Sequence, residues 1–401
     1  MQPKATDERI ARCPAAGADR MTPGARAQAA IEVLDTVLDG AGEGPLLRGP
    51  SAEAVLTRWA RGARYAGSGD RAAVRDLVFS ALRRLRSSAA LGGGLTGRGV
   101  IAGLLIGQGT DPDAVFDGAG HGPAPRTAAE RASGHAPDAA ALLDMPDWLM
   151  PELRRSLGSG TDATCALMRD RAPVHLRANR LRTDRASLAA ALSAEGIETR
   201  NHPLSPTALE VVAGERRLRG AAPLRDGRAE LQDAASQAVA DLVPLAPGMR
   251  VLDMCAGGGG KSLALAARGA RVAAWDADPA RMKDIPRRAA RAGATIEVLR
   301  DPGRGWDLIL CDAPCSGSGA WRRAPEAKWR LTPERLDELV ALQREILSDA
   351  ANRLAPGGWL IYATCSLLDV ENVLSATKVA QSLKLTLREG GDGFYTAQFQ
   401  P

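Results

Sequence analysis

The stretch that most constrains the fold begins at Met249, where short apolar segments alternate with segments that favour helices. The predicted strands cover 250–255, 272–276, 296–299, 307–312 and 359–364. Helices are predicted from Lys261, from Pro279, over 334–354 and after the last strand. Such alternation is typical of a doubly wound, Rossmann-like α/β fold with a parallel sheet. Ligands of this fold class bind beyond the carboxyl ends of the strands. We therefore expect a ligand-binding α/β domain over 241–401.

The remainder of the chain is predicted to form three further parts. Residues 1–20 lack any periodic pattern and are expected to be a disordered leader. Over 21–145 apolar residues recur at helical spacing, which predicts an all-α bundle that ends in a Gly- and Pro-rich linker at 107–139. Over 146–240 predicted strands and helices mix, which indicates a small α+β domain. At about 150 residues per domain, 401 residues fit this division.

Composition excludes several classes of protein. With 45% hydrophobic and 25% charged residues the chain is an ordinary globular one, and it contains no run of 18 apolar residues that would predict a membrane span. Its polar start predicts no secretory signal, so we expect a cytoplasmic protein. The net charge of +5 is compatible with binding nucleic acid, and 14 Arg against 10 acidic residues lie within 151–230. Six cysteines in a chain of this length do not indicate a disulfide framework.

A glycine-rich turn follows the first predicted strand. Its sequence is Cys255-Ala256-Gly257-Gly258-Gly259-Gly260-Lys261-Ser262, which lacks both the first glycine of a P-loop and the spacing of a dinucleotide fingerprint. Asp276 ends the next strand, where an acid can accept both hydroxyls of a ribose. A glycine turn followed by an acidic residue that can bind ribose, without a fingerprint for pyrophosphate, suits S-adenosylmethionine. The alternative is a tight turn beside a surface acid.

Two cysteines follow two other strands of the same predicted sheet. They lie in Asp312-Ala-Pro-Cys315-Ser-Gly and in Thr364-Cys365-Ser, so both thiols should face one crevice. No Cys-x-x-Cys pair or neighbouring histidine completes a ligand set, and no metal is expected. Cys165, Cys255 and Cys311 are interpreted as buried, unreactive thiols. The residues alone leave open which of Cys315 and Cys365 is the nucleophile.

These motifs resemble the signatures of the RNA cytosine-C5 methyltransferases. In order and spacing, the glycine turn, the Cys315 motif and the Cys365 motif are most similar to the bacterial RsmB/Sun type, which methylates small-subunit ribosomal RNA. Residues 70–79 resemble the NusB-like helical domain of those enzymes, 230–237 the segment before their catalytic domain, and Gly391-Asp-Gly-Phe-Tyr their closing strand. The resemblance implies a methyltransferase that binds S-adenosylmethionine and RNA.

The resemblance also implies roles for individual residues. Cys365 would be the nucleophile, Cys315 would help to resolve the covalent adduct, and Lys261 and Asp312 would hold the edge of the cytosine. The implied cofactor-binding residues are Cys255, Ala256, Gly257, Gly258, Gly259, Gly260, Lys261, Asp276, Asp301 and Asp312. This chain departs from the family in having Gly258 where proline is usual and Ala324 where histidine is common.

The chemistry explains why a thiol is needed. Carbon 5 of cytosine becomes nucleophilic enough to take a methyl group only after a thiolate adds to carbon 6. An acid near the ring nitrogen then stabilises the developing charge. We expect a monomer that methylates carbon 5 of a cytosine in small-subunit ribosomal RNA. The alternatives are a non-catalytic RNA-binding assembly factor and a methyltransferase that acts on tRNA or on a substrate other than RNA.

Overall fold

The computed structural model describes residues 21–39, 46–372 and 379–400, and these residues form two compact units. The first unit contains the described residues of 1–40 together with 48–81 and 87–136. The second contains those of 41–47 together with 82–86 and the described residues of 137–401. Each unit is described by itself. The predicted leader at 1–20 lies outside the described residues.

The first unit is helical. Thr22 caps its first helix by accepting the N–H of Ala25, and Pro23 occupies the first turn, where its missing N–H costs nothing. The helices are α1 (Pro23–Leu38), α2 (Ala52–Gly62), α3 (Ser68–Arg83), α4 (Leu85–Gly92), α5 (Gly97–Gly107) and α6 (Ala128–Ser133). Residues 82–86, at the end of α3 and the start of α4, belong to the second unit.

The predicted linker after α5 contains more structure than its composition indicates. Asp113 receives ion pairs from Arg126 and Arg131, at 2.8 and 2.9 Å. Thr127 and Glu130 form a capping box at the start of α6. Side-chain pairing between polar residues therefore orders a segment that has few large apolar side chains.

The second unit contains a small antiparallel sheet with the order β2-β3-β1-β4. Its strands are β1 (Val174–Ala178), β2 (Glu198–Asn201), β3 (Ala208–Ala213) and β4 (Ala229–Leu231), and α10 (Arg185–Ala194) and α11 (Ala222–Arg225) accompany them. Leu188 and Leu192 of α10 pack with Leu176 and Leu209 of the sheet in one apolar cluster. The short helices α7 (Ala139–Leu142), α8 (Met150–Leu157) and α9 (Thr161–Met168) precede β1.

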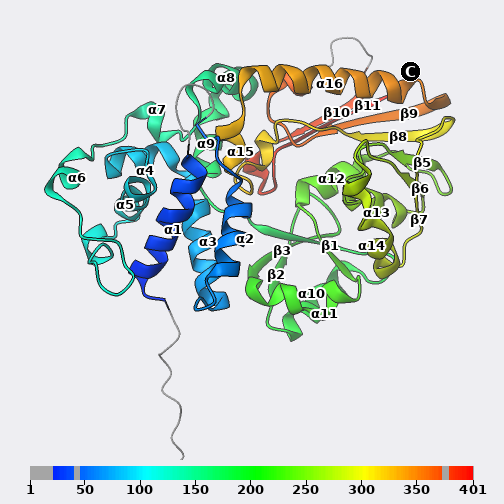
Figure 1. The fold of residues 1–401 in the computed structure, drawn as a ribbon. Coiled ribbons are helices and arrows are strands. Elements are labelled where there is room, and N and C mark those ends of the chain that lie inside the picture. Colours follow the sequence, from blue (N-terminus) through cyan, green and yellow to red (C-terminus); the bar gives the residue numbers. More distant parts are fainter. Residues whose placement is uncertain (1–20, 40–45, 373–378, 401) are drawn as a thin grey trace, which may run out of the picture. The chain divides into compact units, whose positions relative to one another are not determined.

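A seven-stranded sheet forms the larger part of the second unit (Figure 1). Its order is β10-β11-β9-β8-β5-β6-β7, in which β5 to β9 run parallel. The parallel strands are β5 (Arg250–Asp253), β6 (Arg271–Ala274), β7 (Ile296–Val298), β8 (Trp306–Asp312) and β9 (Leu354–Thr364). The chain order reverses at β5, whose two neighbours are β6 and β8. The predicted Rossmann-like fold is thereby confirmed, and its topological switch point lies beside β5.

Alternate residues of the central strands face two layers of helices, which explains their continuous apolar runs. Leu308 and Leu310 pack in the same cluster as residues of α12 (Ala234–Leu242) and α13 (Gly260–Ala266). Ile309 and Cys311 pack in another cluster with residues of α16 (Pro333–Ala351). The other helices of this part are α14 (Ile285–Ala292), α15 (Glu326–Arg330) and α17 (Asp369–Asn372).

The last two strands differ from the parallel pattern. β10 (Val379–Leu385) and β11 (Phe394–Phe399) form a hairpin, and β11 pairs antiparallel with β9. The closing strand implied by the resemblance is β11, whereas β10 was not predicted. Among the described helices none alone is long and apolar enough to cross a membrane. Only the pair α4 and α5 meets that test, across a bend of 94°.

Candidate active site

The carboxyl ends of three adjacent strands bring the predicted site residues together. Cys255 follows β5, Cys315 follows β8 and Cys365 follows β9, and these strands are neighbours in the order β9-β8-β5. Parallel strands end at the same edge of a sheet, so loops from distant parts of the sequence meet there. The crevice expected from the sequence is therefore formed by the ends of β5, β8 and β9.

The two predicted catalytic thiols are in contact. Cys315 Sγ lies 3.4 Å from Cys365 Sγ, a hydrogen-bond distance for sulfur, and both residues are partly exposed. The hydrogen bond to Cys365 and burial both raise the pKa of Cys315 well above its usual value. Burial and the neighbouring sulfur therefore both favour the protonated form of Cys315. The two sulfurs are close enough for one thiol to donate a hydrogen bond to the other.

The buried Lys261 and the partly exposed Asp312 form an ion pair at the same edge of the sheet. Lys261 Nζ lies 2.6 Å from Asp312 Oδ2 and 5.0 Å from the centre of the Phe394 ring. Burial by itself would lower the pKa of Lys261, but the neighbouring carboxylates of Asp312 and Asp253 outweigh it and raise that pKa. Lys261 therefore carries a positive charge beside the partly exposed carboxylate of Asp312.

The glycine turn adopts backbone conformations that exclude larger residues. Gly257 and Gly259 have φ of +49° and +78°, in the left-handed region. A Cβ atom on Gly259 would also lie 2.9 Å from Cγ1 of Ile285. Only glycine fits at position 259 without a shift of the Ile285 side chain, so the turn brings bare backbone to the end of β5.

Asp276 lies at this turn, as the sequence predicts, but its carboxylate is already engaged. One oxygen accepts the N–H of Gly257 at 2.9 Å, and the other accepts that of Asp278 at 3.0 Å. Arg281 pairs with the same carboxylate at 3.1 Å. Asp276 therefore holds the glycine turn in place, in addition to any contact with a ligand.

Asp253 is a buried acid that the sequence analysis did not assign to the site. Ser262 Oγ donates to its Oδ2 at 2.6 Å, whereas Oδ1 has no hydrogen-bond partner among the described residues. Burial raises the pKa of Asp253 to about 6. A buried, unsatisfied acceptor at the end of β5 suits a ligand that donates a hydrogen bond. Its place inside the predicted strand at 250–255, just before the glycine turn, was the available signal.

The remaining cysteines and Asp301 differ in their surroundings. Burial raises the pKa of Cys165 to about 11 and the pKa values of Cys255 and Cys311 further. Asp301 lies in an exposed turn after β7, where its carboxylate accepts the N–H of Gly303 at 3.1 Å. Among the described residues, no hydrogen bond or ion pair joins Asp301 to the glycine turn.

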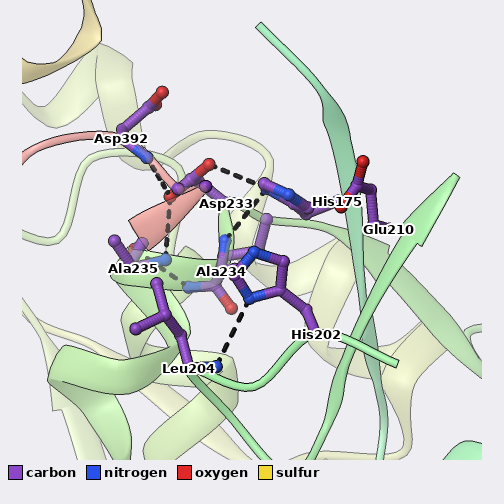
Figure 2. A network of polar contacts seen from close by, with 12 residues as sticks. His175, His202, Leu204, Glu210, Asp233, Ala234, Ala235 and Asp392 are labelled. Atoms are coloured by element: carbon purple, nitrogen blue, oxygen red, sulfur yellow. Dashed lines mark hydrogen bonds and ion pairs between the residues drawn. The ribbon is translucent and has the colours of Figure 1, made fainter. Parts of the chain in front are cut away.

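Asp233 connects the small sheet to the large one (Figure 2). His175 of β1 donates to its Oδ2 at 2.9 Å, and the N–H of Asp392, just before β11, donates to its Oδ1 at 2.9 Å. Burial opposes the negative charge, but the hydrogen bond from His175 and the charge of Arg323 hold the pKa of Asp233 well below its usual range. The segment at 230–237 therefore anchors the small sheet next to the site.

One group of side chains in the described part of the chain has the residue types of a metal site. The ligand atoms of His175, His202 and Glu210 lie within 4.8 Å of one another (Figure 2). Glu210 already binds Arg200 through both oxygens, at 2.9 to 3.1 Å. His175 Nδ1 binds Asp233. We therefore assign no metal to this group. That the protein binds no metal stays a prediction.

Two segments of the chain match families of known proteins. Residues 241–391 match the family 16S rRNA methyltransferase RsmB/F, and residues 145–214 match its ferredoxin-like domain, described as Methyltr_RsmF/B-like. A methyltransferase of Mycobacterium tuberculosis (strain H37Rv) is 40% identical over 239 residues, which is 55% of this chain and 50% of that protein. Ribosomal RNA small subunit methyltransferase B of Vibrio cholerae is 37% identical over 243 residues, 57% of this chain and 55% of that protein. The chain thus spans about half the length of the curated relatives it matches.

Two crystal structures share the fold. That of PH0851 has a TM-score of 0.69 with 21% identity and covers 96% of this chain and 100% of its own. A methyltransferase homologue from Pyrococcus horikoshii has a TM-score of 0.55 with 21% identity and covers 64% and 96%. At this identity they support the fold alone. By the matches over 145–214 and 241–391, together with the sequence relatives, this chain belongs to the RsmB/F methyltransferase family.

Proposed function

We propose that this chain transfers a methyl group from S-adenosylmethionine to carbon 5 of a cytosine in small-subunit ribosomal RNA, through a covalent adduct with Cys365. The observation that carries the proposal is the pair of thiols, 3.4 Å apart and at the same strand ends as the Lys261–Asp312 ion pair. Family membership supports methyl transfer to ribosomal RNA. The cytosine position rests on the chemistry of the site.

The end of β5 has features that suit S-adenosylmethionine. Gly257 and Gly259 provide backbone without side chains, Asp276 fixes the turn, and Asp253 Oδ1 is a buried acceptor with no partner among the described residues. The chain's acids favour a cationic ligand here, since Asp253, Asp276 and Asp312 all raise the pKa of Cys255 after burial itself. When bound, S-adenosylmethionine supplies an electrophilic methyl group.

The thiols and the ion pair then have separate tasks. The Cys365 thiolate adds to carbon 6 of the ring, forming an S–C bond and making carbon 5 nucleophilic. Asp312 accepts hydrogen bonds from the amine edge of the ring, and Lys261 fixes the orientation of that carboxylate. Once carbon 5 carries the methyl group, its proton passes to a base, the electrons of that C–H bond form the double bond between carbons 5 and 6, and the S–C bond breaks to release Cys365 as a thiolate. A sulfur 3.4 Å from the nucleophile, that of Cys315, is placed to assist this step.

The small sheet is proposed to contribute to RNA binding. It lies within the segment that carries 14 Arg against 10 acidic residues, and Asp233 ties it to the large sheet. Arginine guanidinium groups contact phosphates in bidentate fashion. The helical first unit is proposed as a second RNA-binding part.

The test is methyl transfer to RNA with labelled cofactor and nucleoside analysis. The protein is incubated with tritiated S-adenosylmethionine and with small-subunit ribosomal RNA, tRNA or no RNA. We expect label in 5-methylcytidine from the ribosomal RNA, and loss of that label with Cys365→Ala by more than about 10³-fold. Label in another nucleoside, in tRNA alone or in no RNA would contradict the proposal.

A further inference from the structure

A buried carboxylate outside the predicted site residues joins the two loops that carry the thiols. Glu371 of α17 is 1% exposed. Its Oε2 accepts the hydroxyls of Ser316 and Ser366, both at 2.5 Å. Its Oε1 accepts the N–H of Ser316 at 2.8 Å and the side-chain amide of Gln343 at 3.0 Å. Two oxygens thus receive four donors, so the charge is fully solvated by the protein.

The two serines are the residues that directly follow the two cysteines. Ser316 follows Cys315 and Ser366 follows Cys365, which are 50 positions apart in the sequence. One oxygen atom of Glu371 therefore accepts hydrogen bonds from both Cys-Ser dipeptides. We propose that Glu371 is a positioning residue that sets the separation of the thiols of Cys315 and Cys365 and thereby permits the resolving step.

Other hydrogen bonds also join the two loops. The N–H of Gly319 donates to the carbonyl of Cys365 at 2.9 Å, and Leu367 N–H donates to Ser318 Oγ at 2.8 Å. The hydroxyls of Ser316 and Ser366 are also 3.4 Å apart, a longer contact than the 2.5 Å that each makes to Glu371. The carboxylate of Glu371 is therefore the group that makes the short bonds to both residues next to the sulfurs.

The role of Glu371 in turnover rests on the proposed function, so the test includes a measurement that does not depend on methyl transfer. Diamide oxidises a pair of adjacent thiols to a disulfide. The thiols lose two electrons and two protons, and the N=N bond of diamide is reduced to a hydrazine. The rate of the Cys315–Cys365 disulfide, followed by peptide mass spectrometry on the full chain, reports the separation of the sulfurs directly.

Glu371→Gln replaces the acceptor shared by the two hydroxyls with an amide donor of the same size. We expect it to slow disulfide formation by about tenfold and to lower kcat by about 10- to 100-fold, while KM for RNA changes by less than about twofold. Asp144→Asn is the matched control, since Asp144 is also a fully buried acid and pairs with Arg169 at 3.0 Å. It should leave the rate of disulfide formation unchanged.

A folded Glu371→Gln protein with the disulfide rate and kcat of the parent chain would overturn the proposal. So would an Asp144→Asn protein that is slowed equally, because the effect would then be general destabilisation. If Glu371→Gln does not fold, the double variant Ser316→Ala/Ser366→Ala, which removes both hydroxyls, decides by the same criteria. If the parent chain methylates no RNA, the proposed function fails while the disulfide rates still decide the role of Glu371.

Discussion

Asp253 and Lys261 are both buried at the end of β5, and burial affects their charges differently. Lys261 has the carboxylate of Asp312 at 2.6 Å, so its charge is compensated. Asp253 has a hydroxyl from Ser262 but leaves Oδ1 without a partner in the described residues, so its charged form is disfavoured. An uncompensated acid in the interior costs stability, and its retention is typical of functional sites.

The raised pKa of Asp253 predicts a specific pH dependence of stability. Folding raises this pKa from 3.8 to about 6, so the folded state favours the protonated acid. The stabilisation that this preference gives to the folded state is fully present below pH 3.8 and is lost as the pH rises through about 6. At neutral pH the penalty is on the order of 3 kcal/mol. We expect Asp253→Asn to stabilise the protein increasingly as the pH rises from 3.8 to about 6, and by a constant amount above that.

Urea unfolding at several pH values measures this effect. The exposed Asp337→Asn serves as the control, whose difference from the parent chain should not vary with pH. A stability gain for Asp253→Asn that is the same at every pH would show that the acid is not disfavoured in the folded state.

At the scale of elements, the turn between β5 and α13 depends on two constraints at Gly259. Its φ is positive, and Ile285 of α14 leaves no room for a Cβ atom. Gly269 has a φ of +91° but nothing within 4 Å of a Cβ position. A substitution at Gly269 therefore tests the effect of the positive φ alone. We expect Gly269→Ala to cost about 1 kcal/mol in unfolding free energy. Gly259→Ala should cost roughly 1–3 kcal/mol more, because the side chain of Ile285 must shift.

Denaturant unfolding and calorimetric titration with S-adenosylmethionine distinguish the two variants. Only Gly259→Ala should weaken cofactor binding, since its turn faces the end of β5. Equal losses of stability at both positions would mean that the contact with Ile285 is relieved without cost.

The elements that were predicted are those whose signal is local. Each parallel strand contains a short run rich in apolar residues, so β5, β6, β7, β8 and β9 could be placed from the sequence, although the edge strand β7 is mostly exposed. β10 (Val379–Leu385) was missed because it has polar residues within it and owes its place to pairing with β11. The thiols could be placed from the ends of β8 and β9. The role of Glu371 was missed because it arises where two loops 50 residues apart meet.

At the scale of the whole molecule, the boundary between helical and later parts is not a single cut in the sequence. Residues 82–86 belong to the second unit, where Trp329 Nε1 donates to the carbonyl of Leu82 at 2.7 Å and Lys328 Nζ to that of Arg83 at 3.1 Å. Burial lowers the pKa of Lys328 to about 8. A chain that begins at residue 146 lacks residues 82–86, and with them the carbonyl of Arg83 that accepts from Lys328.

This arrangement predicts coupling between truncation and Lys328. In the chain of residues 146–401, Lys328→Met should raise Tm by about 2–4 °C relative to its effect in the full chain, because only in the full chain does the substitution also remove the hydrogen bond to the carbonyl of Arg83. Differential scanning calorimetry measures the Tm of the full chain and of residues 146–401, each with and without Lys328→Met. The difference between the two effects of the substitution is the coupling. An identical effect of Lys328→Met in both backgrounds would show that residues 82–86 do not support this side chain.

The central claim is that the two thiols act in sequence, and trapping of the RNA adduct tests it most directly. Labelled ribosomal RNA is incubated with S-adenosylmethionine and Cys365→Ala or Cys315→Ala, and the products are separated by denaturing electrophoresis. Cys365→Ala lacks the nucleophile and should form no covalent complex. Cys315→Ala should attack and methylate but stall, so a protein–RNA species should accumulate and survive denaturation. A trapped complex with Cys365→Ala, or with neither variant, would contradict the account.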